Sequence, residues 1–188
     1  MNQNPSTNLR MTVYSSLFTA LVIIGGYLSF PIPVSPVPIV LSDFFVLLTG
    51  LFLGPAWGLM SIGLYIFFGA LGLPVFAAGK AGLAVFFGPT GGYLLGFLAC
   101  VFLAGIISGR GKPSAVKDLF ALIVGSLVIY VFGVPWLKIM LNLTWGKALA
   151  AGFLPFIPGM LIKIVVALGL IKILRPRFKQ TMYPGQQG

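Results

Sequence analysis

The chain has 188 residues, of which 59% are hydrophobic and only 7% are charged, and its formal net charge is +10. Soluble domains carry about a quarter charged residues, so this composition excludes a globular protein with a solvated surface. It indicates an integral membrane protein, in which each helix needs roughly 20 apolar residues to cross the bilayer. Six such helices fit the length. We therefore expect an all-α integral membrane protein whose residues 1–188 form a single transmembrane domain.

The residue types needed for catalysis are nearly absent. The chain has no His, and its only acidic residues are Asp43 and Asp118. Acid–base catalysis, metal binding and hydrolytic triads depend on these types, so we predict no enzymatic activity, no metal and no cofactor. The segment around Gly79 and Lys80 also lacks the pattern of an ATP-binding phosphate loop. The basic residues are spread along the chain, which indicates charges at the lipid surface rather than a site for nucleic acid.

The first predicted helix covers residues 11–30. Residues 31–38 contain four prolines and should be extended or turned. The second helix, residues 39–53, ends at Gly54-Pro55 and is too short to cross about 30 Å of hydrocarbon. The proline-rich loop must therefore occupy membrane depth, where non-helical backbone requires surrounding protein or a water-filled cavity. This is the first indication of a ligand chamber.

Four further helices are predicted at residues 56–73, 91–108, 118–140 and 155–174. The long loop at residues 74–90, which precedes the second of these, is rich in Gly and Ala. Pro135 should interrupt and kink the helix that contains it, because proline lacks an amide hydrogen. The pattern Gly92-x-x-x-Gly96 should let two helix backbones approach closely.

The distribution of basic residues predicts the orientation. With a cytoplasmic N terminus, the inner side carries Arg10, Arg110, Lys112, Lys117, Lys172, Arg175, Arg177 and Lys179. The outer side carries only Lys80, Lys138 and Lys147. This bias favours cytoplasmic N and C termini, and it brings the loops at 31–38, 74–90 and 141–154 together at the outer face. A substrate would then enter from outside.

Lys163 is the most informative charged residue, because it lies within the apolar span of the last helix. An ionisable group at that depth costs several kcal/mol unless it reaches water or an anionic partner, so it indicates a functional site. Asp43 either pairs with Lys163 and balances its charge, or caps a helix and leaves Lys163 free for a ligand carboxylate. Asp118 is expected to cap a helix at the cytoplasmic side.

Two patterns of small residues suggest close contacts. Residues 88–93 (GPTGGY) leave backbone amides that could bind a ligand, or they form only a tight turn. Thr12, Ser16 and Ala20 recur every four residues in the first helix. Such a stripe lets another helix pack closely, either inside this bundle or on a partner protein.

Six segments stand in a specific order: 36–39 (PVPI), 51–58 (LFLGPAWG), 72–76 (GLPVF), 88–97 (GPTGGYLLGF), 133–137 (GVPWL) and 155–163 (PFIPGMLIK). Together they resemble the BioY family, the biotin-specific S components of energy-coupling factor (ECF) transporters. The resemblance extends from about Arg10 to Lys172. It implies a six-helix S-component fold with biotin near the outer face, under the long loops between helices 1 and 2 and helices 3 and 4.

The resemblance also implies a function and partners. The protein would bind and take up biotin as the substrate-capture subunit of an ECF-type ABC transporter in a bacterial cell membrane. A transmembrane coupling protein and two cytoplasmic ATPases would supply the energy, and the stripe of Thr12, Ser16 and Ala20 would dock on the coupling protein. The alternatives are an S component for a different vitamin, or a self-sufficient membrane carrier.

The residues expected at the biotin site are Lys163, Asp43, Ser42, Gly79, Tyr93 and Met160. Lys163 would neutralise the valerate carboxylate, while Ser42, Asp43 and groups around Gly79 and Tyr93 would address the rings. Met160 replaces an acidic residue that many family members carry, and Ser42-Asp43 replaces a Gln-Thr pair. We hypothesise that Asp43 supplies the missing carboxylate from another wall of the site.

Overall fold

The computed structural model describes residues 5–109 and 114–182 of the chain. Its main elements are α1 (Pro5–Tyr27), β1 (Ser29–Ile32), β2 (Ser35–Val40), α2 (Ser42–Ala70), α3 (Gly91–Gly109), α4 (Ala115–Met140), α5 (Trp145–Gly152) and α6 (Ile157–Met182). Three short 3-10 helices join them: η1 (Ala77–Gly79), η2 (Leu83–Val85) and η3 (Leu154–Phe156). Five helical segments of the described residues are long and apolar enough to cross a membrane. The predicted fold class is therefore confirmed.

Helix α2 contains both the second and the third predicted helix. The predicted boundary is present inside it as a break at Gly54, which has φ 74° and ψ −175°. Only glycine adopts this region of backbone space readily, and Pro55 then starts the next helical stretch. Because a single residue makes the break, no loop separates the two halves. Among the described residues there are thus five membrane-spanning segments instead of the expected six, because α2 joins two of the predicted helices at a break.

The proline-rich segment forms an antiparallel hairpin of β1 and β2, in which Ser29 pairs with Val40 and Ile32 pairs with Ser35. Prolines are tolerated here because each strand has a neighbour on one side only, so amides on the other side need no partner in the sheet. The prediction of an extended or turned segment is confirmed. The hairpin continues to Val40, and α2 consequently begins at Ser42 rather than at residue 39.

Two local predictions differ from the structure. Helix α4 runs without interruption from Ala115 to Met140 with Pro135 inside it. Membrane helices accommodate an internal proline when packed neighbours and small backbone adjustments replace the lost hydrogen bond. The loop predicted at residues 141–154 contains the short helix α5, whose first turn is capped by the Thr144 side chain accepting the Lys147 amide.

Close backbone contacts hold the bundle together, as expected where lipid removes most of the hydrophobic force between helices. A Cβ atom added at Gly96 would lie 2.8 Å from the backbone of Ile129, which shows that α3 and α4 touch there. A Cβ at Gly105 would lie 2.6 Å from the Pro55 nitrogen, at the break in α2. The predicted close approach at Gly92-x-x-x-Gly96 is therefore confirmed as packing of α3 on α4.

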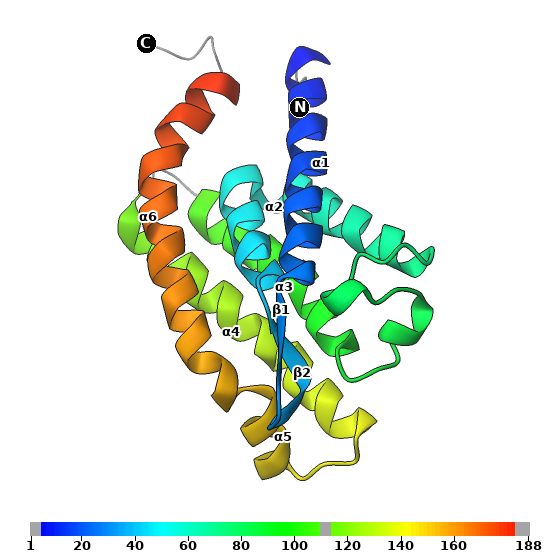
Figure 1. Cartoon of the computed structure of the whole chain (residues 1–188). Coiled ribbons are helices and arrows are strands. Elements are labelled where there is room, and N and C mark those ends of the chain that lie inside the picture. The colour runs from blue at the N-terminus through cyan, green and yellow to red at the C-terminus, as the bar shows by residue number, and fades with distance from the viewer. Residues whose placement is uncertain (1–4, 110–113, 183–188) are drawn as a thin grey trace.

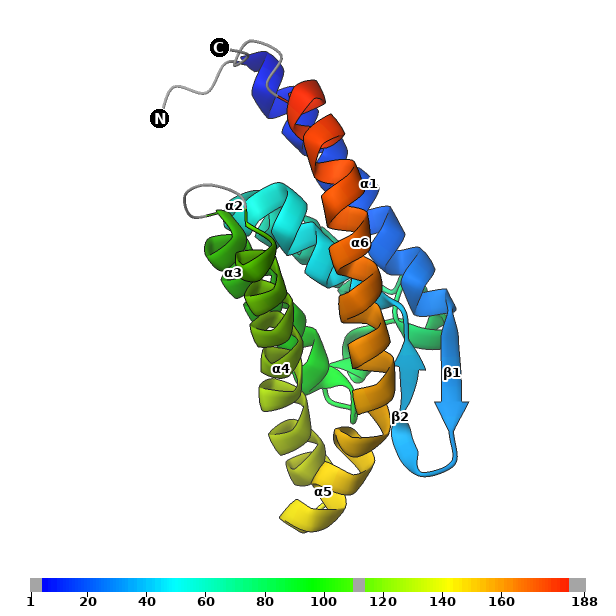
Figure 2. The ribbon, with the colours of Figure 1, turned by 90° about the vertical axis from the view of Figure 1, so that its left-hand side faces the viewer.

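The first turns of α1 and the last turns of α6 lie at one end of the bundle and extend beyond α2, α3 and α4 (Figures 1 and 2). The hairpin lies beside the other half of α6, and α5 lies at the far end (Figure 2). We call the end with the first turns of α1 and the last turns of α6 the terminal end. The end with the hairpin and α5 is called the pocket end. The cytoplasmic location of the terminal end stays a prediction, and two residues used for it, Arg110 and Lys112, lie outside the described residues.

Asp118 does not cap α4, which corrects the prediction. The residue that precedes the helix is Ser114, and the Asp118 side chain is buried. Its carboxylate oxygens accept hydrogen bonds from Ser108 Oγ at 2.7 Å and from the Arg175 guanidinium at 2.6 Å. Packing of α6 against the first turn of α4 brings this arginine to the carboxylate, and the two opposite charges pair in a low-dielectric setting.

Candidate ligand-binding site

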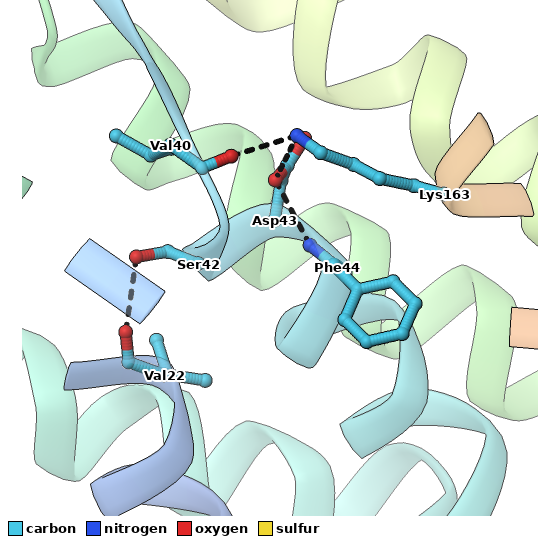
Figure 3. A network of polar contacts seen from close by, with 6 residues as sticks. All are labelled: Val22, Val40, Ser42, Asp43, Phe44 and Lys163. Atoms are coloured by element: carbon cyan, nitrogen blue, oxygen red, sulfur yellow. Dashed lines mark hydrogen bonds and ion pairs between the residues drawn. The ribbon is translucent and has the colours of Figure 1, made fainter. Parts of the chain in front are cut away.

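Lys163 of α6 and Asp43 of α2 form an ion pair at the pocket end (Figure 3). The Lys163 ammonium lies 2.7 Å from Asp43 Oδ1 and 2.8 Å from Oδ2. It also donates to the Val40 carbonyl at 2.7 Å, from the last residue of β2. An ammonium group has three protons, so these three acceptors satisfy it fully. Of the two predicted alternatives, the structure contains the charge-balanced pair.

Asp43 also interacts with the start of α2. The Phe44 amide donates to Asp43 Oδ1 at 2.9 Å (Figure 3). A carboxylate in the first helical turn is favourable because the exposed amides there carry partial positive charge. Oδ1 thus accepts two hydrogen bonds from described residues, whereas Oδ2 accepts one and keeps a lone pair for a further donor.

The ion pair borders a cavity of about 70 Å³ between the hairpin, the segment from residue 71 to residue 90, and helices α2, α3, α4 and α6. Six of its eighteen lining residues are aromatic: Tyr65, Phe76, Tyr93, Phe97, Tyr130 and Phe156. Ligand pockets typically hold 300–1,000 Å³ and combine apolar walls with a few placed polar groups. A ligand of that size therefore requires the walls of this cavity to move apart. The hairpin and the 71–90 segment are the walls outside the packed membrane helices.

Four of the six predicted site residues line this cavity: Ser42, Asp43, Tyr93 and Lys163. The hydroxyls of two of them are bound to backbone carbonyls. Ser42 Oγ donates to Val22 at 2.9 Å, and the Tyr93 hydroxyl donates to Gly152 at 2.8 Å. The Tyr93 hydroxyl is thus engaged by the backbone, and Ser42 fixes the start of α2 against α1.

Gly79 and Met160 lie beside the cavity rather than in its wall. Gly79 has φ 71° and sits between two lining residues, Ala77 and Lys80. Its left-handed backbone turns the chain so that Lys80 can reach the cavity. Met160 is partly buried against the hydrophobic core, about one helical turn before Lys163.

Three further residues line the cavity that were not expected there from the sequence: Lys80, Thr90 and Tyr130. The available signal for Lys80 was its place between two glycines, Gly79 and Gly82, in a loop expected to cover the ligand. Tyr130 packs edge to face on Tyr93, with ring centroids 6.2 Å apart, and helical periodicity alone did not indicate this contact.

The small-residue stripe of α1 is exposed along its whole length, at Thr12, Ser16 and Ala20. The Thr12 hydroxyl donates to the Asn8 carbonyl at 3.0 Å, and the Ser16 hydroxyl donates to the Thr12 carbonyl at 3.1 Å. The neighbouring face of α1, with Ser15 and Thr19, is buried against α2. The stripe therefore does not pack inside this bundle.

These features define a class: a multi-pass helical membrane protein with a partly aromatic cavity at its pocket end, bordered by an ion pair. Within that class the chain belongs to the BioY family, since the model of that family matches residues 1–180. Its relatives include bacterial transporters, and the chain is a multi-pass bacterial membrane protein.

Two relatives and one solved structure illustrate the similarity. The biotin transporter BioY of Thermotoga maritima is 40% identical over 85% of this chain and 92% of its own length. The probable biotin transporter BioY of Pyrococcus horikoshii is 44% identical over 81% of this chain and 88% of its own. The crystal structure of the S-component for biotin from an ECF-type ABC transporter superposes with a TM-score of 0.86 and 31% identity. That match covers 93% of this chain and 95% of the other.

Proposed function

We propose that this protein binds biotin with high affinity and serves as the substrate-capture subunit of an ECF-type ABC transporter. The observation that carries the proposal is the aromatic cavity with the Lys163–Asp43 pair, in a fold that superposes on a biotin S-component with a TM-score of 0.86. The function is transport rather than catalysis, in agreement with the relatives named biotin transporter.

The chemistry of biotin suits this cavity. Biotin has an apolar sulfur-containing ring, a ureido group with N–H donors and a carbonyl acceptor, and a valerate carboxylate. Aromatic side chains such as Tyr65, Phe97 and Tyr130 can cover the apolar ring. Asp43 can accept a hydrogen bond from a ureido N–H. This bond replaces the hydrogen bond to water that the ureido group loses when it enters the site.

The predicted site residues keep distinct proposed roles. Lys163 and Asp43 form the polar floor of the site, and Ser42 and Tyr93 shape its walls. The left-handed backbone of Gly79 shapes the loop that borders the cavity, and Met160 packs about one helical turn from Lys163.

The exposed stripe of α1 supports the proposed partners. Thr12 and Ser16 direct their hydroxyls to carbonyls of their own helix, so the stripe offers a small and largely apolar surface to another membrane helix. We infer that this helix belongs to a transmembrane coupling protein. Two cytoplasmic ATPases would then hydrolyse the ATP, and the lipid bilayer surrounds the remaining exposed apolar side chains.

Equilibrium dialysis of the purified chain against labelled biotin tests the proposal. We expect saturable binding that unlabelled biotin displaces and that riboflavin and thiamine do not. Displacement by another vitamin instead of biotin would favour the alternative of a different S component. Uptake by liposomes that contain this chain alone would favour a self-sufficient carrier, whereas uptake only with the coupling protein, the ATPases and ATP supports the proposal.

A further inference from the structure

We propose that Lys80, in the segment between α2 and α3, binds the carboxylate of the ligand, while the Lys163–Asp43 pair stays intact and receives a ligand N–H group. This inference deepens the proposed function and rests on it. It assigns an orientation to the ligand, with its charged end toward Lys80 and its donor groups toward Asp43.

The first reason is that all three N–H groups of the Lys163 ammonium already donate hydrogen bonds. Its ammonium donates to both oxygens of Asp43 and to the Val40 carbonyl, at 2.7 to 2.8 Å. A ligand carboxylate at Lys163 would have to displace one of these acceptors and would lie beside the Asp43 carboxylate. The two side chains are only 13% and 16% exposed, and like charges repel strongly where water is scarce.

The second reason is that Asp43 still has capacity as an acceptor. Oδ1 accepts from Lys163 and from the Phe44 amide, whereas Oδ2 accepts only from Lys163 among the described residues. The free lone pair of Oδ2 suits a neutral N–H donor. A ureido group supplies such a donor without adding charge, so the ion pair stays balanced.

The third reason is that Lys80 offers a second cation in the same cavity wall. Lys80 takes part in neither of the ion pairs described above, Lys163 with Asp43 and Arg175 with Asp118. The wall then carries two lysines and one aspartate. One ligand carboxylate makes the occupied site neutral, and placing it at Lys80 leaves the existing pair undisturbed.

The backbone of Lys80 is held in place although its side chain is exposed. Its carbonyl accepts the Phe76 amide at 3.0 Å, and its own amide donates to Ala77 at 3.3 Å. The Phe76 ring in turn fills the space beside Gly69, where an added Cβ would lie 2.0 Å from the ring. This anchored turn presents the ammonium group at the cavity without immobilising it.

The exposure of Lys80 has a chemical consequence for specificity. A carboxylate bound there keeps part of its hydration shell, so the desolvation cost is smaller than at the buried Lys163. An uncharged carboxamide in the same place would lose only the attraction of an exposed cation. We therefore expect a modest preference for the acid over the amide.

The test compares the dissociation constants of biotin and its uncharged carboxamide for the wild type, Lys80→Gln and Lys80→Arg. We expect Lys80→Gln to weaken biotin binding about fivefold and to leave amide binding within about twofold, because exposed ion pairs are worth up to roughly 1 kcal/mol. Lys80→Arg keeps the charge and should keep the preference for the acid. Lys147→Gln, at an exposed lysine of α5 outside the cavity, is the matched control and should change neither constant.

Two outcomes would contradict these proposals. If Lys80→Gln retains the acid preference and Lys163→Gln abolishes it, the carboxylate binds at Lys163 and the inference is wrong, although biotin binding by the wild type would still support the proposed function. If the wild type binds neither compound, the proposed function itself fails.

Discussion

The two ion pairs of α6 use the same chemistry for different purposes. Lys163 pairs with Asp43 at the pocket end, and Arg175 pairs with Asp118 nearer the terminal end. Their positions on the helix differ by twelve residues, or roughly 18 Å. Asp43 and Asp118 are also the only two acidic residues of the chain. Each acid therefore forms an ion pair with a basic residue of the same helix.

The difference lies in what surrounds each pair. The Arg175 guanidinium bonds Asp118 and Ser108 at 2.6 Å each, and it contacts the Leu51 carbonyl at 3.4 Å. Its planar fork of donors thus joins α6 to α2, α3 and α4. Lys163 carries a compact charge beside an aromatic cavity and joins α6 only to the start of α2 and the end of β2. The Arg175 pair connects four helices, and the Lys163 pair borders the cavity.

The largest expected effect is on stability at the Arg175 pair. Replacing Asp118 by Ala leaves a buried guanidinium without its anion, which should cost about 3 to 5 kcal/mol of the free energy of unfolding. Thermal unfolding in detergent measures the change, and the folded fraction should retain its affinity for biotin. A wild-type unfolding temperature together with lost biotin binding would reverse the roles assigned to the two pairs.

A smaller effect, this time on binding, is expected at Lys163. Lys163→Ala leaves Asp43 as an uncompensated anion in the cavity wall, and affinity should fall by about 2 kcal/mol or roughly 30-fold. If the orientation inferred above is right, biotin and its carboxamide lose affinity equally. Calorimetric titration gives both constants, and binding within about twofold of wild type would remove Lys163 from the site.

Asp43→Asn should have a milder consequence. The amide keeps the size of the side chain and one acceptor oxygen, but it removes the anion beside Lys163. We expect about a tenfold loss of affinity, since a neutral acceptor forms a weaker hydrogen bond than a charged one. Unchanged binding in equilibrium dialysis would exclude Asp43 from ligand contact. Ser35→Ala, in the hairpin but outside the cavity wall, serves as a control.

The smallest effect on the isolated chain is expected on the α1 stripe, which touches neither ion pair. Ser16→Leu enlarges an exposed side chain, so biotin affinity should stay within about twofold, while close approach of a partner helix is blocked. ATP-driven uptake by the reconstituted transporter should fall at least about tenfold. Val116→Leu, on the exposed face of α4, is the matched control, and equal uptake by both variants would place the partner elsewhere.

The sequence was sufficient to predict features set by local chemistry. The prolines of residues 31–38 exclude a helix, Gly54-Pro55 breaks one, and the depth of Lys163 demands a partner within the bundle. These properties depend on residue type and on distance along a helix, and both can be read from a single sequence. The choice between an Asp43 pair and a free Lys163 required the structure, because it depends on how far β2 carries the chain before α2 begins.

Features set by helix rotation and by loop backbone could not be predicted in this way. Asp118 lies in a first turn and so resembles a cap, but its partner is Arg175, which another helix places beside it. Which face of α4 meets α6 depends on packing across the whole bundle. Lys80 reaches the cavity because Ala78 and Gly79 adopt positive φ values of 56° and 71°, and this turn was visible only in the structure.

The break in α2 and the Arg175 pair form one unit. A proline has no amide hydrogen, so Pro55 cannot donate to the carbonyl four residues earlier, which is that of Leu51. Arg175 supplies a donor to this orphaned carbonyl, at 3.4 Å. Positions 55 and 175 are therefore coupled across more than half of the chain. A homologue without the proline would lose the need for this contact, whereas Asp118 and Ser108 would still require Arg175.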